Sequence, residues 1–247
     1  MKVVGIIPAR YNSTRFPGKP LAMIKGKTMI RRVCEQAWKS KLDAVVVATD
    51  DVRIADEVMG FGGQYVLTDP NHRSGTDRCR EALDLIENQY DAVINIQGDE
   101  PFIDPKQIDL LIDLISRDDT LLASVAKKIE DEEELFSPNA VKVVMDKDGK
   151  ALYFSRNPIP FVRNAERSEW LDKCVFYKHV GIYAYKADVL RQVAQMQPTA
   201  LELAESLEQL RWLENGLPIH MAVIDADGIS VDTPDDLRRA EQFIQNQ

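Results

Sequence analysis

Short β-rich runs and helical stretches alternate strictly along the first 120 residues of the chain. The β-rich runs are apolar and largely β-branched, as is typical of strands buried on both faces of a sheet. They cover residues 3–7, 44–48, 64–67 and 92–96. Helical spacing is found between them, over residues 28–40, 52–60, 75–87 and 105–116. This alternation predicts right-handed βαβ crossovers and an α/β fold with a doubly wound, mostly parallel sheet.

The pattern changes after residue 120. We expect a strand at 121–126 and a helical turn beside the acidic run 130–134. Residues 140–145 and 151–154 flank the turn sequence Asp-Lys-Asp-Gly, which predicts a β-hairpin. The remaining expectations are a loop-rich stretch at 155–173, strands at 178–185 and 219–224, and helices at 201–214 and 235–245. The whole chain, 1–247, is predicted to be one domain with an inserted antiparallel lobe at about 130–185.

The balance of charge excludes one class of partner. The chain has 31 Lys and Arg residues against 40 Asp and Glu residues, a formal net charge of −9. A protein that wraps a nucleic acid needs a broad basic face, so no nucleic-acid partner is expected. A small anion can still bind in a local basic pocket.

Other signals bear on the compartment and on metals. No apolar run approaches the roughly 20 residues of a membrane span, and the first ten residues turn polar too early for a secretion signal. The three cysteines are scattered and odd in number, which fits a reducing, cytoplasmic compartment. No HExxH or CxxC spacing for zinc is present.

The segment PARYNSTRFPGKP, residues 8–20, follows the first predicted strand and precedes the first long helix. In a doubly wound sheet this is the carboxyl edge, where ligands bind. Arg10, Arg15 and Lys19 are the cations of this loop, and together with backbone N–H groups they suit a triphosphate. The loop is not a Walker A motif, because position 13 is serine and Pro20 follows the lysine. A solvated basic loop is the alternative.

Carboxylates follow the strand at 92–96, in the segment INIQGDEPFI. Asp99 at the end of a strand, facing a cation-lined loop, suits Mg²⁺ held between protein and substrate phosphates. The alternative is a polar turn in which Asp99 caps the next helix. Asp232, before a Thr-Pro helix start, is by default a cap, but as a second carboxylate at the same edge it would complete a metal site. In HRSGTDR, residues 72–78, Ser74 is expected to cap the following helix, and the same loop can offer backbone groups to a base.

Nine segments, in order, resemble those of the 3-deoxy-manno-octulosonate cytidylyltransferases, also called CMP-Kdo synthetases. They are IPARYNSTRFPGKPL, TDDVRIADEV, HRSGTDR, INIQGDEP, NAVKVV, ALYFSRNPIP, KHVGIYAY, AESLEQLR and VDTPDDL. The resemblance covers essentially the whole chain. Phe16, where the family usually has Leu, and Lys178, where Arg is common, are conservative departures.

The resemblance implies a nucleotide-diphospho-sugar transferase-like fold and a Mg²⁺-dependent reaction of CTP with Kdo, giving CMP-Kdo and pyrophosphate for lipopolysaccharide synthesis. It also implies a cytoplasmic homodimer that associates through the lobe. By this match the triphosphate is held by Arg10 and Lys19, which with Asp99 form the catalytic set. The cytidine is surrounded by Pro8, Ala9, Arg73, Ser74, Gly75 and Gln97. Asp99 and Asp232 bind the metal. The pocket for the sugar acid is lined by Arg156, His179, Tyr183, Glu208 and Gln209.

Two alternatives remain at this stage. The first is the same reaction on a related sugar acid, such as 8-amino-3,8-dideoxy-manno-octulosonate or a sialic acid. The PGKP loop and the SGTDR and DEP segments argue against the sialic acid enzymes but leave the amino sugar open. The second is a non-catalytic nucleotide-binding protein on the same fold, because a fold does not determine function. The presence of both Asp99 and Asp232 argues against a dead site.

Overall fold

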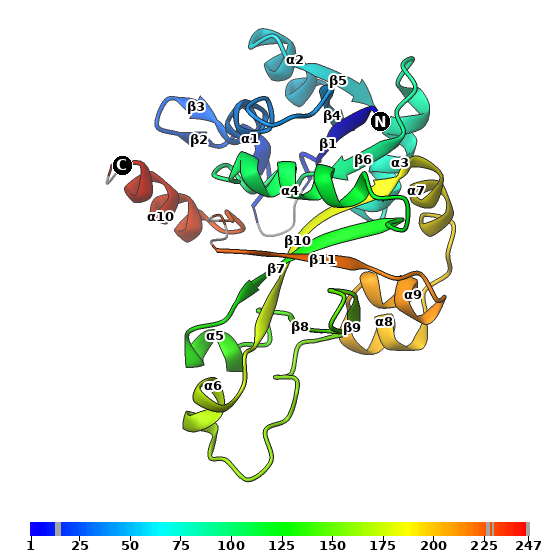
Figure 1. Cartoon of the computed structure of the whole chain (residues 1–247). Coiled ribbons are helices and arrows are strands. Elements are labelled where there is room, and N and C mark those ends of the chain that lie inside the picture. Colours follow the sequence, from blue (N-terminus) through cyan, green and yellow to red (C-terminus); the bar gives the residue numbers. More distant parts are fainter. Residues whose placement is uncertain (13–15, 226–227, 229, 246–247) are drawn as a thin grey trace.

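Nine strands form one sheet in the part of the chain that the computed structural model describes, residues 1–12, 16–225, 228 and 230–245. The main path of the sheet has the order β11-β7-β10-β6-β1-β4-β5 (Figure 1). These strands are β11 (His220–Ile224), β7 (Leu122–Lys128), β10 (Tyr177–Lys186), β6 (Ala92–Asn95), β1 (Val3–Ala9), β4 (Ala44–Thr49) and β5 (Gln64–Leu67). β8 (Lys142–Met145) and β9 (Ala151–Ser155) branch from β10.

Most neighbours in this path are parallel. β6 and β4 lie parallel on the two sides of β1, β5 is parallel to β4, and β11 is parallel to β7. The predicted doubly wound, mostly parallel α/β fold is therefore confirmed. β10 is the exception, because it lies between β6 and β7 and is antiparallel to both.

Helices cover both faces of the sheet, and the period-2 pattern of each strand divides the core between them. Val3 and Ile7 of β1 share one core with helices α1, α2 and α4, whereas Val4 and Ile6 share the other with α3, α7 and α9. The first group is α1 (Met29–Ala37), α2 (Val52–Gly60) and α4 (Pro105–Ile115). The second is α3 (Gly75–Leu85), α7 (Ala187–Val193) and α9 (Gln209–Glu214). Strands buried on both faces thus explain the apolar runs.

The single helix predicted over 201–214 is wrong. Two short helices, α8 (Ala200–Glu205) and α9, occupy this stretch. Ser206 ends α8 in the left-handed region, at φ 53° and ψ 49°. The guanidinium of Arg156 donates to the carbonyl oxygens of Glu205 at 2.7 Å and of Ser206 at 3.3 Å. A donor about 50 residues away stabilises this break, and helical periodicity does not report such a contact.

A lobe extends from the sheet, below it in Figure 1. It contains α5 (Glu132–Phe136), α6 (Trp170–Lys173) and the β8–β9 pair, which confirms the predicted hairpin. A small core of its own includes Leu135, Trp170 and Phe176. β10 belongs to the lobe and the sheet at once, because Tyr177 pairs with Val143 of β8 while Tyr183 pairs with Asn95 of β6.

Helix α10 (Pro234–Gln245) confirms the predicted C-terminal helix. The segment before it packs beside β2 (Met23–Ile24), β3 (Lys27–Thr28) and the start of α1, where Val231 shares a core with Ile24 and Met29. This packing brings a segment from the end of the chain next to the loop after β1. None of the described helices combines the length and the apolar character of a membrane span.

Candidate active site

A cavity of about 240 Å³ opens at the carboxyl ends of β1 and β6, beside the start of α3. All eight residues predicted to bind the nucleotide line it, together with both predicted metal carboxylates: Pro8, Ala9, Arg10, Lys19, Arg73, Ser74, Gly75, Gln97, Asp99 and Asp232. Parallel strands place their carboxyl ends at one edge, and residues from four segments of the chain converge there. Arg15 lies outside the described residues.

Lys19 joins the two predicted metal carboxylates. Its ammonium Nζ lies 2.7 Å from Asp99 Oδ2 and 3.1 Å from Asp232 Oδ1. A backbone hydrogen bond from Val231 N to Asp99 O, at 2.8 Å, holds the segment before α10 against the end of β6. Two carboxylates from residues 133 positions apart therefore share one cation, and a second cationic side chain, Arg10, lines the same cavity.

The donor set suits magnesium. Mg²⁺ prefers oxygen ligands and is usually bound by one or two carboxylates plus substrate phosphates and water. Among the described residues no group of three or more His, Cys, Asp or Glu side chains forms a metal cluster. A protein that offers Asp99 and Asp232 alone leaves the remaining positions to phosphate oxygens and water, so these residues fit the ion.

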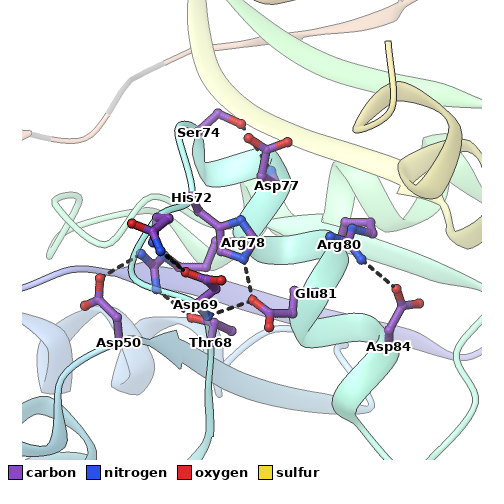
Figure 2. A network of polar contacts seen from close by, with 11 residues as sticks. Asp50, Thr68, Asp69, His72, Ser74, Asp77, Arg78, Arg80, Glu81 and Asp84 are labelled. Atoms are coloured by element: carbon purple, nitrogen blue, oxygen red, sulfur yellow. Dashed lines mark hydrogen bonds and ion pairs between the residues drawn. The ribbon is translucent and has the colours of Figure 1, made fainter. Parts of the chain in front are cut away.

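The loop before α3 is fixed from within. Ser74 caps the helix as predicted, since its Oγ accepts from Asp77 N at 3.1 Å. Figure 2 shows the guanidinium of Arg78 between Asp50 and Thr68, which follow β4 and β5. Arg78 donates to Thr68 Oγ1 at 2.5 Å and to Asp50 Oδ2 at 2.9 Å. The network therefore binds the loop and its helix to the carboxyl ends of two neighbouring strands.

A second contact holds the same loop from the side of α3. His72, which lines the cavity, has its Nε2 atom against Glu81 Oε2 of α3 (Figure 2). The same carboxylate accepts from Asp69 N at 2.9 Å. Glu81 thus anchors both ends of the turn that leads into the loop before α3.

Four lining residues were not among the predicted ligands: Pro20, His72, Arg78 and Gly98. Gly98 is the most informative of them. A Cβ atom at this position would lie 2.8 Å from the carbonyl oxygen of Pro8, so only glycine lets the ends of β1 and β6 approach this closely. The glycine in QGDEP was the available signal, but sequence spacing did not show which backbone it faces.

The five predicted sugar-acid residues do not line this cavity. His179 and Tyr183 lie on β10 with their rings 5.3 Å apart, and Gln209 is buried at the start of α9. The two groups of residues are nevertheless joined, because Gln97 Nε2 donates to the carbonyl of Gly181 at 2.8 Å. Arg156 donates to three backbone carbonyls, those of Pro138, Glu205 and Ser206.

Glu208 makes a second link between the groups. The hydroxyl of Thr76, in the first turn of α3, donates to Glu208 Oε2 at 3.0 Å. Burial raises the pKa of Glu208 above its usual value, and the Thr76 hydrogen bond only partly opposes this. A half-buried carboxylate therefore connects the start of α9 to the first turn of α3.

The sheet and the cation-lined cavity are those of a nucleotidyltransferase, and residues 4–221 match the sequence model of the cytidylyltransferase family. A 3-deoxy-manno-octulosonate cytidylyltransferase of Parabacteroides distasonis is 52% identical, over 100% of this chain and 99% of the relative. One of Cytophaga hutchinsonii is 54% identical, over 97% and 96%. The chain belongs to the family of 3-deoxy-manno-octulosonate cytidylyltransferases.

A solved structure gives the same result. The structure of a CMP:2-keto-3-deoxy-manno-octonic acid synthetase complexed with CTP superposes with a TM-score of 0.93 at 42% identity. The match covers 100% of this chain and 99% of that one. The predicted family and enzyme class are confirmed.

Proposed function

We propose that the protein transfers CMP from CTP to the anomeric hydroxyl of Kdo, giving CMP-Kdo and pyrophosphate. The observation that carries this proposal is the cavity at the sheet edge, where Arg10, Lys19, Asp99 and Asp232 meet. It lies in a chain that is similar over its full length to proteins named for this reaction. The nucleotide-binding roles of the lining residues are part of the proposal.

The reaction is a nucleotidyl transfer in which the sugar hydroxyl attacks the α-phosphorus in line and pyrophosphate leaves. Positioning and electrostatic stabilisation dominate such reactions, and no covalent intermediate is needed. Arg10 and Lys19 bind the triphosphate and stabilise the leaving pyrophosphate. Asp99 and Asp232 hold magnesium, which when bound neutralises charge on the phosphates. When CTP binds, the Lys19 ammonium group leaves the carboxylates of Asp99 and Asp232 and pairs with phosphate oxygens instead.

The sugar acid is proposed to lie beyond the cavity, against His179 and Tyr183 of β10 and against Glu208 and Gln209. Their link to the nucleotide loop through Gln97 and Thr76 supports this placement. Arg156 is proposed to act here as well, although its guanidinium donates to carbonyl groups of the lobe and of α8.

We also propose a homodimer in the cytoplasm, acting in lipopolysaccharide synthesis. The lobe presents apolar side chains to solvent, of which Phe161 is 76% and Val175 52% exposed, as at a subunit interface. The three cysteines are free, as is usual in a reducing compartment.

The test is release of pyrophosphate from CTP, measured with and without a sugar acid. We expect release only when Kdo is present, and formation of CMP-Kdo detected by mass spectrometry. A panel with the 8-amino analogue and a sialic acid identifies the preferred acceptor. Binding of CTP without turnover on any acceptor would instead support a non-catalytic nucleotide-binding protein.

A further inference from the structure

Ser124 of β7 is completely buried beside His179, at the point where β10 is irregular. Its hydroxyl oxygen lies 2.9 Å from His179 Nε2, 2.8 Å from the carbonyl oxygen of Ile182 and 3.3 Å from that of Val180. Three polar groups of one strand therefore converge on a single hydroxyl group of the neighbouring strand.

The irregularity in β10 explains why the hydroxyl is needed. Val180 pairs with Val125 and Tyr183 pairs with Ser124, so β10 advances three residues where β7 advances one. The extra residues turn backbone carbonyls out of the ladder. Gln97 donates to the carbonyl of Gly181 at 2.8 Å, and Ser124 lies against those of Val180 and Ile182. Side chains thus replace missing ladder partners.

The chemistry of these groups determines the direction of each hydrogen bond. A serine hydroxyl has one proton to donate, and a carbonyl oxygen can only accept. In one arrangement the Ser124 hydroxyl donates its proton to Ile182 O. The hydrogen bond with His179 then requires that Nε2 carries a hydrogen and donates it to the serine oxygen. The opposite arrangement, with the hydroxyl donating to Nε2, leaves two buried carbonyls without this donor.

We infer that Ser124 is a positioning residue that holds His179 as its Nε2–H tautomer, so that Nδ1 acts as a hydrogen-bond acceptor for a hydroxyl group of the sugar acid. This inference rests on the proposed function. The imidazole then recognises a hydroxyl donor on the sugar acid, and the carboxylate of the sugar acid must be bound by other groups of the protein. No hydrogen bond to Nδ1 from any described residue occupies that acceptor.

The surroundings of the ring agree with a neutral acceptor. The ring of Phe154 lies edge-on at 5.0 Å and that of Tyr183 at 5.3 Å. Burial lowers the pKa of His179 to about 3, so the imidazole is uncharged at neutral pH. A neutral ring with a fixed tautomer attracts a hydroxyl hydrogen and gives no charge to pair with a carboxylate.

The first experiment reads the tautomer directly. Long-range proton–nitrogen correlation spectra of protein labelled with nitrogen-15 histidine separate protonated from unprotonated ring nitrogens, and His179→Gln assigns the signals. We expect wild type to show protonated Nε2 and unprotonated Nδ1 at neutral pH. A ring protonated at Nδ1, or at both nitrogens, would overturn the inference without any variant of Ser124.

The second experiment uses Ser124→Ala with steady-state kinetics. We expect mixed tautomers at His179 and a rise of about three- to tenfold in the KM for Kdo, the size of one lost hydrogen bond, with the KM for CTP unchanged. Ser124→Thr, which keeps the hydroxyl, should restore both readouts. Thr120→Val, which removes another fully buried hydroxyl just before β7, controls for general loss of stability.

The outcomes separate this inference from the proposed function. If wild type turns over Kdo but Ser124→Ala leaves both the tautomer and the KM for Kdo unchanged, the inference is wrong and the function stands. If no sugar acid is turned over, the function fails, while the spectra still report whether Ser124 determines the tautomer.

Discussion

The Lys19 ammonium group can bind two different sets of oxygen atoms. In the free protein its ammonium group joins Asp99 and Asp232, and during the proposed reaction it binds phosphate oxygens. A cation placed between two carboxylates competes with a metal ion for the same oxygens. We therefore expect the residue to raise the affinity for the nucleotide and to oppose binding of the metal by itself.

Lys19→Ala is expected to change these two affinities in opposite directions. Loss of a charge-assisted hydrogen bond of about 1.5–3 kcal/mol should weaken CTP binding roughly 10- to 100-fold and leave the affinity for the sugar acid unchanged. Binding of Mn²⁺ alone should become tighter, because Asp99 and Asp232 lose their shared cation. Calorimetry with each ligand measures both effects. Unchanged CTP binding with lost sugar binding would show that the pocket is assigned in reverse.

Asp99→Asn should keep the fold and lose most of the turnover. Magnesium supplies several kcal/mol of charge stabilisation, so we expect kcat to fall on the order of a hundredfold or more. The control is Asp113→Asn, whose side chain is 64% exposed on α4. Circular dichroism checks the fold. Near wild-type turnover at saturating magnesium would exclude Asp99 as a metal ligand.

Glu208→Gln should change the pH dependence of stability. The pKa of Glu208 is raised chiefly by burial, so folding favours its protonated form. Wild type therefore loses stability as the pH rises through this raised pKa, whereas a glutamine does not titrate. We expect the variant to gain stability relative to wild type from acidic to neutral pH in urea unfolding. Glu130→Gln, at an exposed position, is the control, and equal pH profiles for both variants would contradict the assignment.

At the scale of elements, the site depends on how closely β1 and β6 end beside each other. Gly98→Ala places a methyl group 2.8 Å from the carbonyl oxygen of Pro8, which is backbone and has little freedom to move. Overpacking of this kind costs about 1–3 kcal/mol, and we expect lower stability together with weaker CTP binding. Thermal unfolding and calorimetry measure the two effects.

A matched control is available on α2. Gly60→Ala adds the same methyl group at a position where, apart from the neighbouring residues and the backbone of α2 itself, no atom lies within 4 Å. This variant should unfold at or slightly above the wild-type temperature, since alanine is the better helix former. If Gly98→Ala behaves in the same way, the close approach of the two strands does not shape the cavity.

For the molecule as a whole, the proposed dimer depends on apolar side chains that the lobe exposes. Phe161 is 76% exposed, and its ring centroid lies 5.2 Å from that of Trp170. Phe161→Glu should weaken the proposed dimer, because it replaces this apolar side chain with a charged one. Sedimentation velocity measures the assembly. The control is Val52→Glu, at a residue that is 63% exposed on α2, and Figure 1 shows this helix at the opposite end of the molecule from the lobe. An unchanged dimer would remove Phe161 from the interface.

Local patterns were sufficient for most elements of the fold. The apolar runs at 3–7 and 92–96 became β1 and β6, because a strand buried on both faces must be apolar throughout. The stretch at 201–214 shows where this reasoning fails. Its apolar spacing continues across Ser206, and only the contact with Arg156 shows that two helices meet there.

The alternating elements, the family and the residues that line the cavity were all predictable from the amino-acid sequence, since each of these depends on short-range pattern or on ordered motifs. Which groups face one another could be learned from the folded chain alone. The shared cation of Asp99 and Asp232, the contact of Ser124 with His179 and the need for glycine at position 98 each join segments that are distant in the chain. Such contacts depend on how strands are ordered and registered in the sheet, and spacing along a single strand or helix carries no record of that order.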